Sequence, residues 1–158
     1  PFNQDLVLVT EVGKEEETVK RLARVGYDHV LGYLKSGFES WLNSGRLIDK
    51  VDRIDADEFA KKTENNPLVI DVRKQGEFEA EHVIDAENIP LDYLNENLNN
   101  FPNKPFILHC AGGYRSMIAA SVLKIHGVNG FADVIGGFSA ISKTAVKTSQ
   151  FQCSSKGN

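Results

Sequence analysis

Short apolar runs alternate with amphipathic segments along most of the chain. The apolar runs are five or six residues long, a pattern typical of strands buried in a parallel sheet. We expect strands at residues 5–10, 68–72, 84–89, 105–109 and 131–135. We expect helices at residues 14–25, 37–43, 56–63, 75–81, 91–100 and 114–126, and a short last helix after Gly136-Gly137. This alternation predicts an α/β fold, an open and mostly parallel sheet with helices on both faces.

The front of the chain resembles its rear. Arg21–Gly26 parallels Val122–Gly127, and Ser36-Gly-Phe38 parallels Gly136-Gly-Phe138, each pair about 100 residues apart. The order of strand, helix, strand and glycine turn also matches. The alternative is that helices ending at glycine look alike by chance. A true repeat implies two copies of one domain, of which residues 1–45 are only the rear part.

The pattern divides the chain into four stretches. Residues 1–45 are the partial repeat, residues 46–55 a charged linker, residues 56–143 the main domain and residues 144–158 a polar C-terminal tail. The first residue is Pro1 and not Met, so we expect the chain to be a fragment of a longer protein.

Composition narrows the class of protein. The length of 158 residues suits one domain with an additional segment. Apolar residues make up 41% and charged residues 25%, as in ordinary globular proteins. The net charge of −4 without a basic stripe argues against nucleic acid as the main partner. No run approaches the ~18 uncharged apolar residues that a membrane span needs, and no signal peptide is recognisable. We therefore expect a cytoplasmic protein.

The chain has two cysteines, Cys110 and Cys153, and four histidines. Two cysteines are too few for a disulfide framework or a tetrahedral zinc site, and the histidines show no metal-ligand spacing. We expect no metal and no cofactor in this chain, and we expect Cys153 to be a reduced thiol.

The most informative segment runs from Phe106 to Ser116. An apolar strand ends at Cys110, a loop with two glycines follows, and Arg115 stands where a long helix begins. Glycines allow consecutive N–H groups to point inward, and the helix adds its positive end, so the pKa of Cys110 should fall below ~8.5. This cradle suits an anionic substrate or the outer sulfur of a persulfide, with Arg115 adding charge. The alternative is a buried, inert thiol. His109 should point to the opposite face of the strand and have a structural role.

At this point the chain from about Val51 to Ile141 resembles a rhodanese-like (sulfurtransferase) domain. The resemblance rests on ordered motifs: Val69–Arg73, Phe78, His82–Ala86 leading to Ile89-Pro90, Cys110-x-x-Gly113-x-Arg115-Ser116, and Val134–Phe138. It implies the rhodanese-like fold, with no cofactor in this chain.

The resemblance also assigns roles to residues. Cys110 would be the catalytic nucleophile that takes sulfane sulfur from thiosulfate or a low-molecular-weight persulfide and passes it to a thiol or another nucleophilic acceptor. Asp71 and Arg73 would support the active loop. The substrate-binding residues would be Ala111, Gly112, Gly113, Tyr114, Arg115 and Ser116.

Loop length separates this chain from related phosphatases. Four residues lie between Cys110 and Arg115, where phosphatases of this kind have five. A smaller loop suits one sulfur atom better than a tetrahedral phosphate, so a phosphatase or arsenate reductase is the weaker reading. Ala111 stands where many family members carry a charged or polar residue, which counts against a preference for thiosulfate.

The N-terminal piece resembles the rear of a degenerate rhodanese-like domain. The repeat places the counterpart of Cys110 at Val9, so this half should be inactive. Residues 26–34 and 37–41 look like bacterial proteins in which a metallo-β-lactamase-fold persulfide dioxygenase precedes tandem rhodanese domains, which implies such an iron-dependent domain upstream as a partner. The alternative to an enzyme is a non-catalytic rhodanese-like module that docks on or regulates a larger sulfur-metabolism protein.

Overall fold

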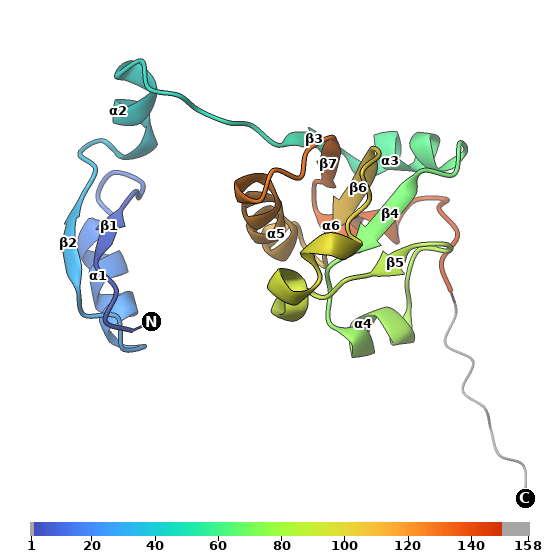
Figure 1. Ribbon diagram of the computed structural model, residues 1–158, viewed down its shortest axis with the longest axis horizontal. Coiled ribbons are helices and arrows are strands. Elements are labelled where there is room, and N and C mark those ends of the chain that lie inside the picture. Colours follow the sequence, from blue (N-terminus) through green and yellow to red (C-terminus); the bar gives the residue numbers. More distant parts are fainter. Residues whose placement is uncertain (1, 150–158) are drawn as a thin grey trace, which may run out of the picture. The chain divides into compact units, whose positions relative to one another are not determined.

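The computed structural model describes residues 2–149 of the chain. The chain forms two compact units, Pro1–Lys50 and Val51–Asn158 (Figure 1). Cys153 lies outside the described residues, so its assignment as a reduced thiol stays a prediction. Within residues 2–149, no helix has the length and apolar character that crossing a bilayer requires.

The second unit is built on five strands. These are β3 (Asp52–Ile54), β4 (Leu68–Asp71), β5 (Glu87–Asn88), β6 (Phe106–His109) and β7 (Phe131–Val134). Their order across the sheet is β3-β7-β6-β4-β5, and every neighbouring pair is parallel. All four residues of the central strand β6 are buried, as expected for a strand covered on both faces. The open parallel sheet predicted from the apolar runs is confirmed.

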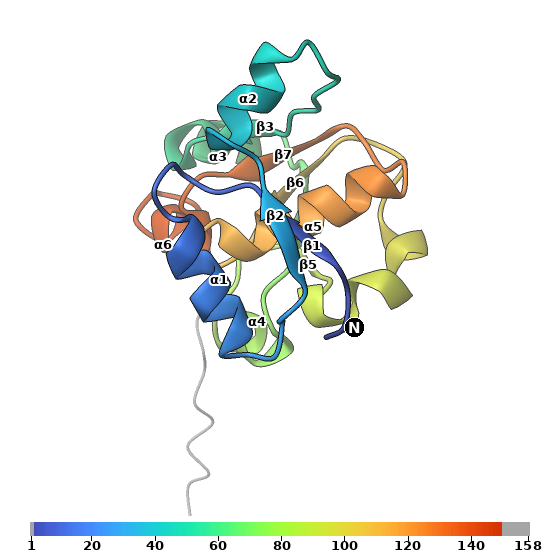
Figure 2. The same cartoon turned by 90° about the vertical axis from the view of Figure 1, so that its left-hand side faces the viewer.

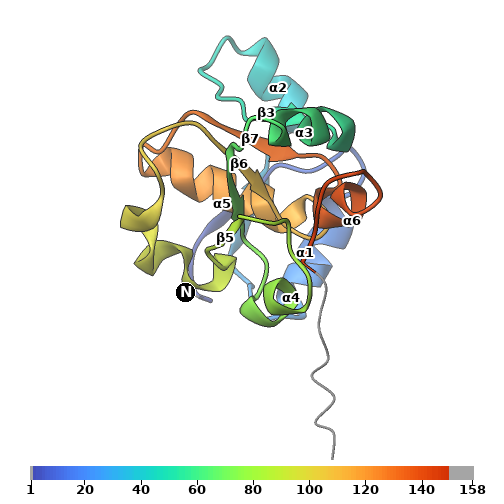
Figure 3. The same cartoon turned by 90° about the vertical axis from the view of Figure 1, so that its right-hand side faces the viewer.

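Helices cover both faces of this sheet (Figure 3). They are α3 (Ala56–Thr63), α4 (Gln75–Ala80), α5 (Tyr114–Ile125) and α6 (Gly137–Ile141), together with two 3-10 segments, η1 (Leu91–Glu96) and η2 (Leu98–Asn100). Leu108 and Cys110 belong to the core on the α5 face, whereas Ile107 belongs to the core that α3 and α6 close. His109 packs between Phe59 of α3 and Phe138 of α6, so it faces away from Cys110 as strand alternation predicts.

The segment expected as a charged linker, residues 46–55, ends in a strand. β3 pairs with β7 at the edge of the sheet, and Ile54 is buried there. Arg53 of this strand donates from Nε to the carboxylate of Asp133 at 3.1 Å. A strand of three residues with one apolar side chain carries too short a pattern to be recognised from sequence.

Two further elements are shorter or tighter than predicted. The helix expected over residues 91–100 is two 3-10 segments separated at Asn97, whose side-chain amide donates to the carbonyl of Tyr93 at 2.9 Å. Asn side chains compete for backbone groups and favour turns over α-helix. The strand expected over residues 84–89 is reduced to β5, because Asp85 adopts a turn with φ of +64°.

The first part of the expected polar tail, residues 144–149, packs against the turn after α4. Thr148 forms an antiparallel bridge with Val83, and the Ile84 N–H donates to the carbonyl of Lys147 at 3.1 Å. Val146 packs against the core beneath α3 and α6. Backbone hydrogen bonds hold this segment in place, and the polar sequence gives no sign of them.

The first unit contains one small parallel sheet. Its elements are β1 (Leu6–Leu8), α1 (Glu15–Ala23), β2 (Val30–Tyr33) and α2 (Gly37–Asn43), as Figure 2 shows. Three acids open α1, and Lys20 and Arg21 close it, each paired at 2.7 Å with a glutamate four residues earlier. This charge order complements the helix dipole.

The first unit has the same order of elements as β6–α5–β7–α6. Gly37 lies against the carbonyl oxygen of Thr10 with φ of +58°, and Gly137 lies against that of Cys110 with φ of +53°. The start of the first strand and these glycine turns are offset by 100 residues, whereas the hydrogen bonds at the end of the helix and the start of the second strand are offset by 101. Thr10, and not the expected Val9, is therefore the counterpart of Cys110.

We expect Gly137→Ala to destabilise the protein more than Gly127→Ala. Both glycines have positive φ, of +53° and +79°, so either alanine costs about 1 kcal/mol for left-handed backbone. Only at Gly137 would the new Cβ press on the backbone of Cys110 and Ala111, while the Cβ at Gly127 would meet nothing within 4 Å. The added loss at Gly137, about 1–2 kcal/mol, is checked by urea unfolding. Equal losses for the two variants would contradict this account.

Candidate active site

The candidate site lies where the strand order reverses. After β4 the chain moves outward to β5, and after β6 it moves the opposite way to β7. In open α/β sheets, ligands bind in the crevice outside the carboxyl ends of strands at such a reversal. The segments that leave these two ends are residues 71–75 and 110–114, which include the predicted site residues Asp71, Arg73 and Cys110.

Hydrogen-bond donors surround the sulfur of Cys110. Its Sγ accepts the N–H of Gly113 at 3.2 Å and the hydroxyl of Ser116 at 3.4 Å. Gly113 is the N-cap of α5 with φ of +92°, a left-handed conformation that turns its N–H inward. The residue Cys110 is only 1% exposed, so the sulfur lies beneath the surface with a backbone N–H facing it.

These donors decide the charge of the sulfur. Burial raises the pKa of Cys110, but the Ser116 hydroxyl and the backbone N–H groups of Ser116, Gly112 and Gly113 lower it by more, so the pKa lies below its ordinary value. The positive N-terminal end of α5 acts in the same direction. The arrangement can hold a sulfur anion, either a thiolate or the terminal sulfur of a persulfide.

The loop itself is anchored to α6. The carbonyl of Cys110 accepts the N–H of Phe138 at 2.6 Å, and that of Ala111 accepts the N–H of Ser139 at 2.9 Å. Both carbonyls are thereby turned away from the sulfur. Tyr114 and Gly112 are both exposed, and their binding of substrate stays a prediction.

Arg115 is held by a carboxylate that the sequence interpretation did not identify. Its Nη1 and Nη2 donate to the two oxygens of Glu77 on α4 at 2.6 and 2.9 Å. The Arg115 hydrogen bonds lower the pKa of Glu77 to about 2, although burial opposes them. Among the acids of α4, the sequence offers no sign that distinguishes Glu77 from Glu79, because both read as solvated helix residues. The ion pair with Glu77 balances the positive charge that the sequence analysis expected from Arg115.

Asp71 and Arg73 brace the turn that follows β4. The guanidinium of Arg73 lies 2.7 Å from the Asp71 carboxylate, and its Nη2 also donates to the carbonyl of Glu81 at 2.7 Å. It stacks over the ring of Phe138, 4.0 Å from the centroid. Asn88, another residue that the motifs did not single out, donates to the carbonyls of both Asp71 and Arg73. These contacts fix the turn after β4, and support of the active loop by Asp71 and Arg73 stays a prediction of the family resemblance.

The two histidines near the loop pack against aromatic rings. His109 is fully buried, and burial lowers its pKa even though the charge of Asp71 opposes the change. Its Nδ1 lies 3.3 Å from the carbonyl of Cys110. His82 stacks on Phe78 with 3.9 Å between ring centroids. His109 therefore has the structural role that its place on the opposite face of the strand predicts.

A third arginine reaches the loop from β3. Arg53 pairs with the fully buried Asp133, and its Nη2 lies 3.8 Å from the position that a Cβ on Gly113 would occupy. Sequence analysis missed this pair because its partners lie 80 residues apart and outside the recognised motifs.

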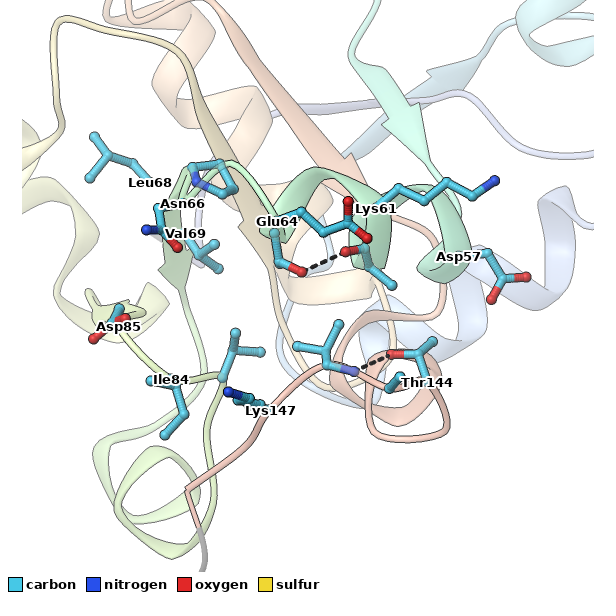
Figure 4. A pocket seen from close by; sticks show the side chains of 16 residues that line it. Asp57, Lys61, Glu64, Asn66, Leu68, Val69, Ile84, Asp85, Thr144 and Lys147 are labelled. Carbon is cyan, nitrogen blue, oxygen red and sulfur yellow. Dashed lines mark hydrogen bonds between the residues drawn. The ribbon is translucent and has the colours of Figure 1, made fainter.

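The second unit also has a cavity away from the loop at Cys110. A cavity of about 1000 Å³ opens between α3, the amino end of β4, the turn at residues 83–85 and the segment 144–147 (Figure 4). The amino end of a strand is opposite to the end that carries Cys110, and none of the loop residues lines this cavity. Within residues 2–149, no cluster of His, Cys, Asp and Glu could hold a metal ion.

Comparisons with known proteins agree with this geometry. The sequence model of the family described as "Rhodanese-like domain" matches residues 55–144. An uncharacterized protein of Bacillus subtilis is 39% identical over 71 residues, covering 44% of this chain and 56% of that protein. The adenylyltransferase and sulfurtransferase of Drosophila ananassae is 34% identical over 108 residues, covering 62% of this chain and 24% of that protein. The crystal structure of a rhodanese-like domain protein from Staphylococcus aureus is 29% identical with a TM-score of 0.55, covering 61% of this chain and 97% of that chain.

The match is partial in both directions. The chain spans about half or less of the length of the curated relatives it matches. The match to the family model begins at residue 55, so it leaves the first unit and the whole of β3 outside.

We expect Ser116→Ala to make Cys110 less reactive at neutral pH. Removal of the hydroxyl deletes one of the groups that lower the pKa of Cys110, so the thiolate forms at higher pH. The rate of alkylation by iodoacetamide at pH 7 should fall several-fold, and the midpoint of its pH profile should rise. Ser121→Ala, on the exposed side of the same helix, is the control and should leave the profile unchanged. A profile that does not move in Ser116→Ala would contradict the assigned role of the hydroxyl.

Proposed function

We propose that this chain, which belongs to the rhodanese-like domain family, is a sulfurtransferase that carries sulfane sulfur as a persulfide on Cys110. The observation that carries the proposal is the buried sulfur of Cys110, which faces the N–H of Gly113 and the hydroxyl of Ser116 at the start of α5. Such donors stabilise a thiolate, which is the nucleophilic form of cysteine.

The transfer proceeds in two displacements. The Cys110 thiolate attacks the outer sulfur of a persulfide R–S–SH, the S–S bond of the donor breaks, and R–S⁻ leaves with the electron pair, giving Cys110–S–SH. With thiosulfate as donor, sulfite leaves in the same way. An acceptor thiolate then attacks the outer sulfur, takes it as a new persulfide, and restores the Cys110 thiolate. The N–H groups of the loop stabilise the anion at each stage.

The size of the loop supports sulfur rather than phosphate as the transferred group. Four residues separate Cys110 from Arg115. The N–H of Gly113 and the hydroxyl of Ser116 lie 3.2 and 3.4 Å from the Cys110 sulfur, where they can stabilise a sulfur anion. The name of the Drosophila relative, which includes sulfurtransferase activity, points in the same direction for this chain.

The remaining parts of the chain fit this proposal as accessories. The partial repeat at residues 1–45, which lies within the first unit, would be the inactive rear of a second rhodanese-like domain. Thr10 stands there at the position that Cys110 has in the second unit. An upstream metallo-β-lactamase-fold domain as a partner stays a proposal drawn from the sequence resemblance. The donor would be a small sulfur compound and the acceptor a thiol.

Incubation with glutathione persulfide should add one sulfur, about 32 Da, to Cys110 and to no other residue. Mass spectrometry of the digested protein measures the adduct. Cys110→Ser should abolish it and reduce sulfur transfer to the uncatalysed background, while Cys153→Ser should retain both.

Three outcomes would contradict the proposal. An unmodified Cys110 would favour a non-catalytic docking module, and equal labelling of Cys153 would mean that Cys110 has no special reactivity. Turnover of a phosphate ester or arsenate by the unmodified enzyme would favour the phosphatase-like reading.

A further inference from the structure

One ion pair joins the two helices that follow β4 and β6. Glu77 lies on α4, which follows β4, and Arg115 lies on α5, which follows β6. These are the two strands between which the order reverses, so the pair joins both walls of the site where a ligand is expected. The bridge is bidentate, with donor–acceptor distances of 2.6 and 2.9 Å, the strongest geometry for an arginine and a carboxylate.

The other arginines around the loop are also committed to carboxylates. Arg73 is bound by Asp71, and Arg53, whose Nη2 lies beside Gly113, is bound by Asp133. Each guanidinium near the loop therefore has a negative partner of its own. The attraction that remains at the sulfur comes from the N–H groups and the Ser116 hydroxyl, which converge on one atom.

This charge balance discriminates between classes of sulfur donor. Thiosulfate carries an anionic sulfonate one bond from the sulfur that is transferred, and binding it at this loop requires a cation to replace its water. An organic persulfide has a neutral carbon-bearing sulfur at that place, and any charges lie several bonds away. A sulfonate must compete for Arg115 with Glu77, whose carboxylate stays ionised throughout the neutral range because its pKa is about 2.

We propose that Glu77 is a specificity-determining residue that neutralises Arg115 and makes the site select organic persulfides over donors with an anionic group beside the sulfane sulfur. This inference rests on the proposed function, because it names the donor class of the same site. The departure at Ala111, an uncharged residue in the active loop, fits the same preference.

The test compares two alkylating agents that differ only in charge. Iodoacetate is an anion and iodoacetamide is neutral, so the ratio of their rates at Cys110 measures the local electrostatics without any sulfur transfer. Glu77→Gln keeps an oxygen that can accept from Arg115 but removes the charge, and should raise the iodoacetate-to-iodoacetamide ratio about threefold, the effect of one unit charge a few ångströms away in a hydrated site. Arg115→Gln should lower the ratio. Glu79→Gln, an exposed glutamate on the same helix, is the matched control and should not change it.

Donor kinetics complete the experiment. Glu77→Gln should lower KM for thiosulfate several-fold relative to KM for glutathione persulfide, with little change in kcat for the persulfide. A purely structural role would change both donors and both alkylating agents in proportion, leaving the two ratios as in the unmodified protein, and that result would overturn the proposal. If the unmodified enzyme transfers sulfur from neither donor, the proposed function fails, while the alkylation ratio still reports on Glu77.

Discussion

The chemistry of this chain depends on a competition at one sulfur atom. Burial of Cys110 favours the neutral thiol, and the donors of the loop favour the anion. The donors prevail because two separate contacts hold the loop in shape: α6 takes the carbonyls of Cys110 and Ala111, and the left-handed Gly113 turns its N–H toward the sulfur. A loop whose carbonyls faced inward would reverse the sign and leave an inert thiol.

The surroundings of the loop follow a second rule, the pairing of charge. Arg53, Arg73 and Arg115 approach from three different elements, and each is bound to a carboxylate from the same unit. A buried or half-buried guanidinium without a partner is costly, so such pairing is what stability requires. The same pairing leaves the backbone amides as the main source of attraction for an anion, which ties the stability of the fold to the choice of donor.

The two units share one backbone arrangement. Both contain strand, helix, strand and a glycine turn, and in both the glycine lies against a residue just after the first strand. That residue is Cys110 in one and Thr10 in the other. The backbone arrangement is therefore a property of the glycine turn, and the reactive side chain is an addition to it.

The sequence by itself determined the parallel sheet, its helices and the loop at Cys110, because apolar periodicity, glycines and the strand-to-helix transition are local signals. It did not reveal β3, the 3-10 segments or the ordering of residues 144–149, since those depend on pairing with distant segments or on side chains that compete for the backbone. The pairs Glu77–Arg115 and Arg53–Asp133 were decided only by the tertiary structure. A charged residue on a short element looks the same in sequence whether it is solvated or bound, and only the approach of two elements settles which.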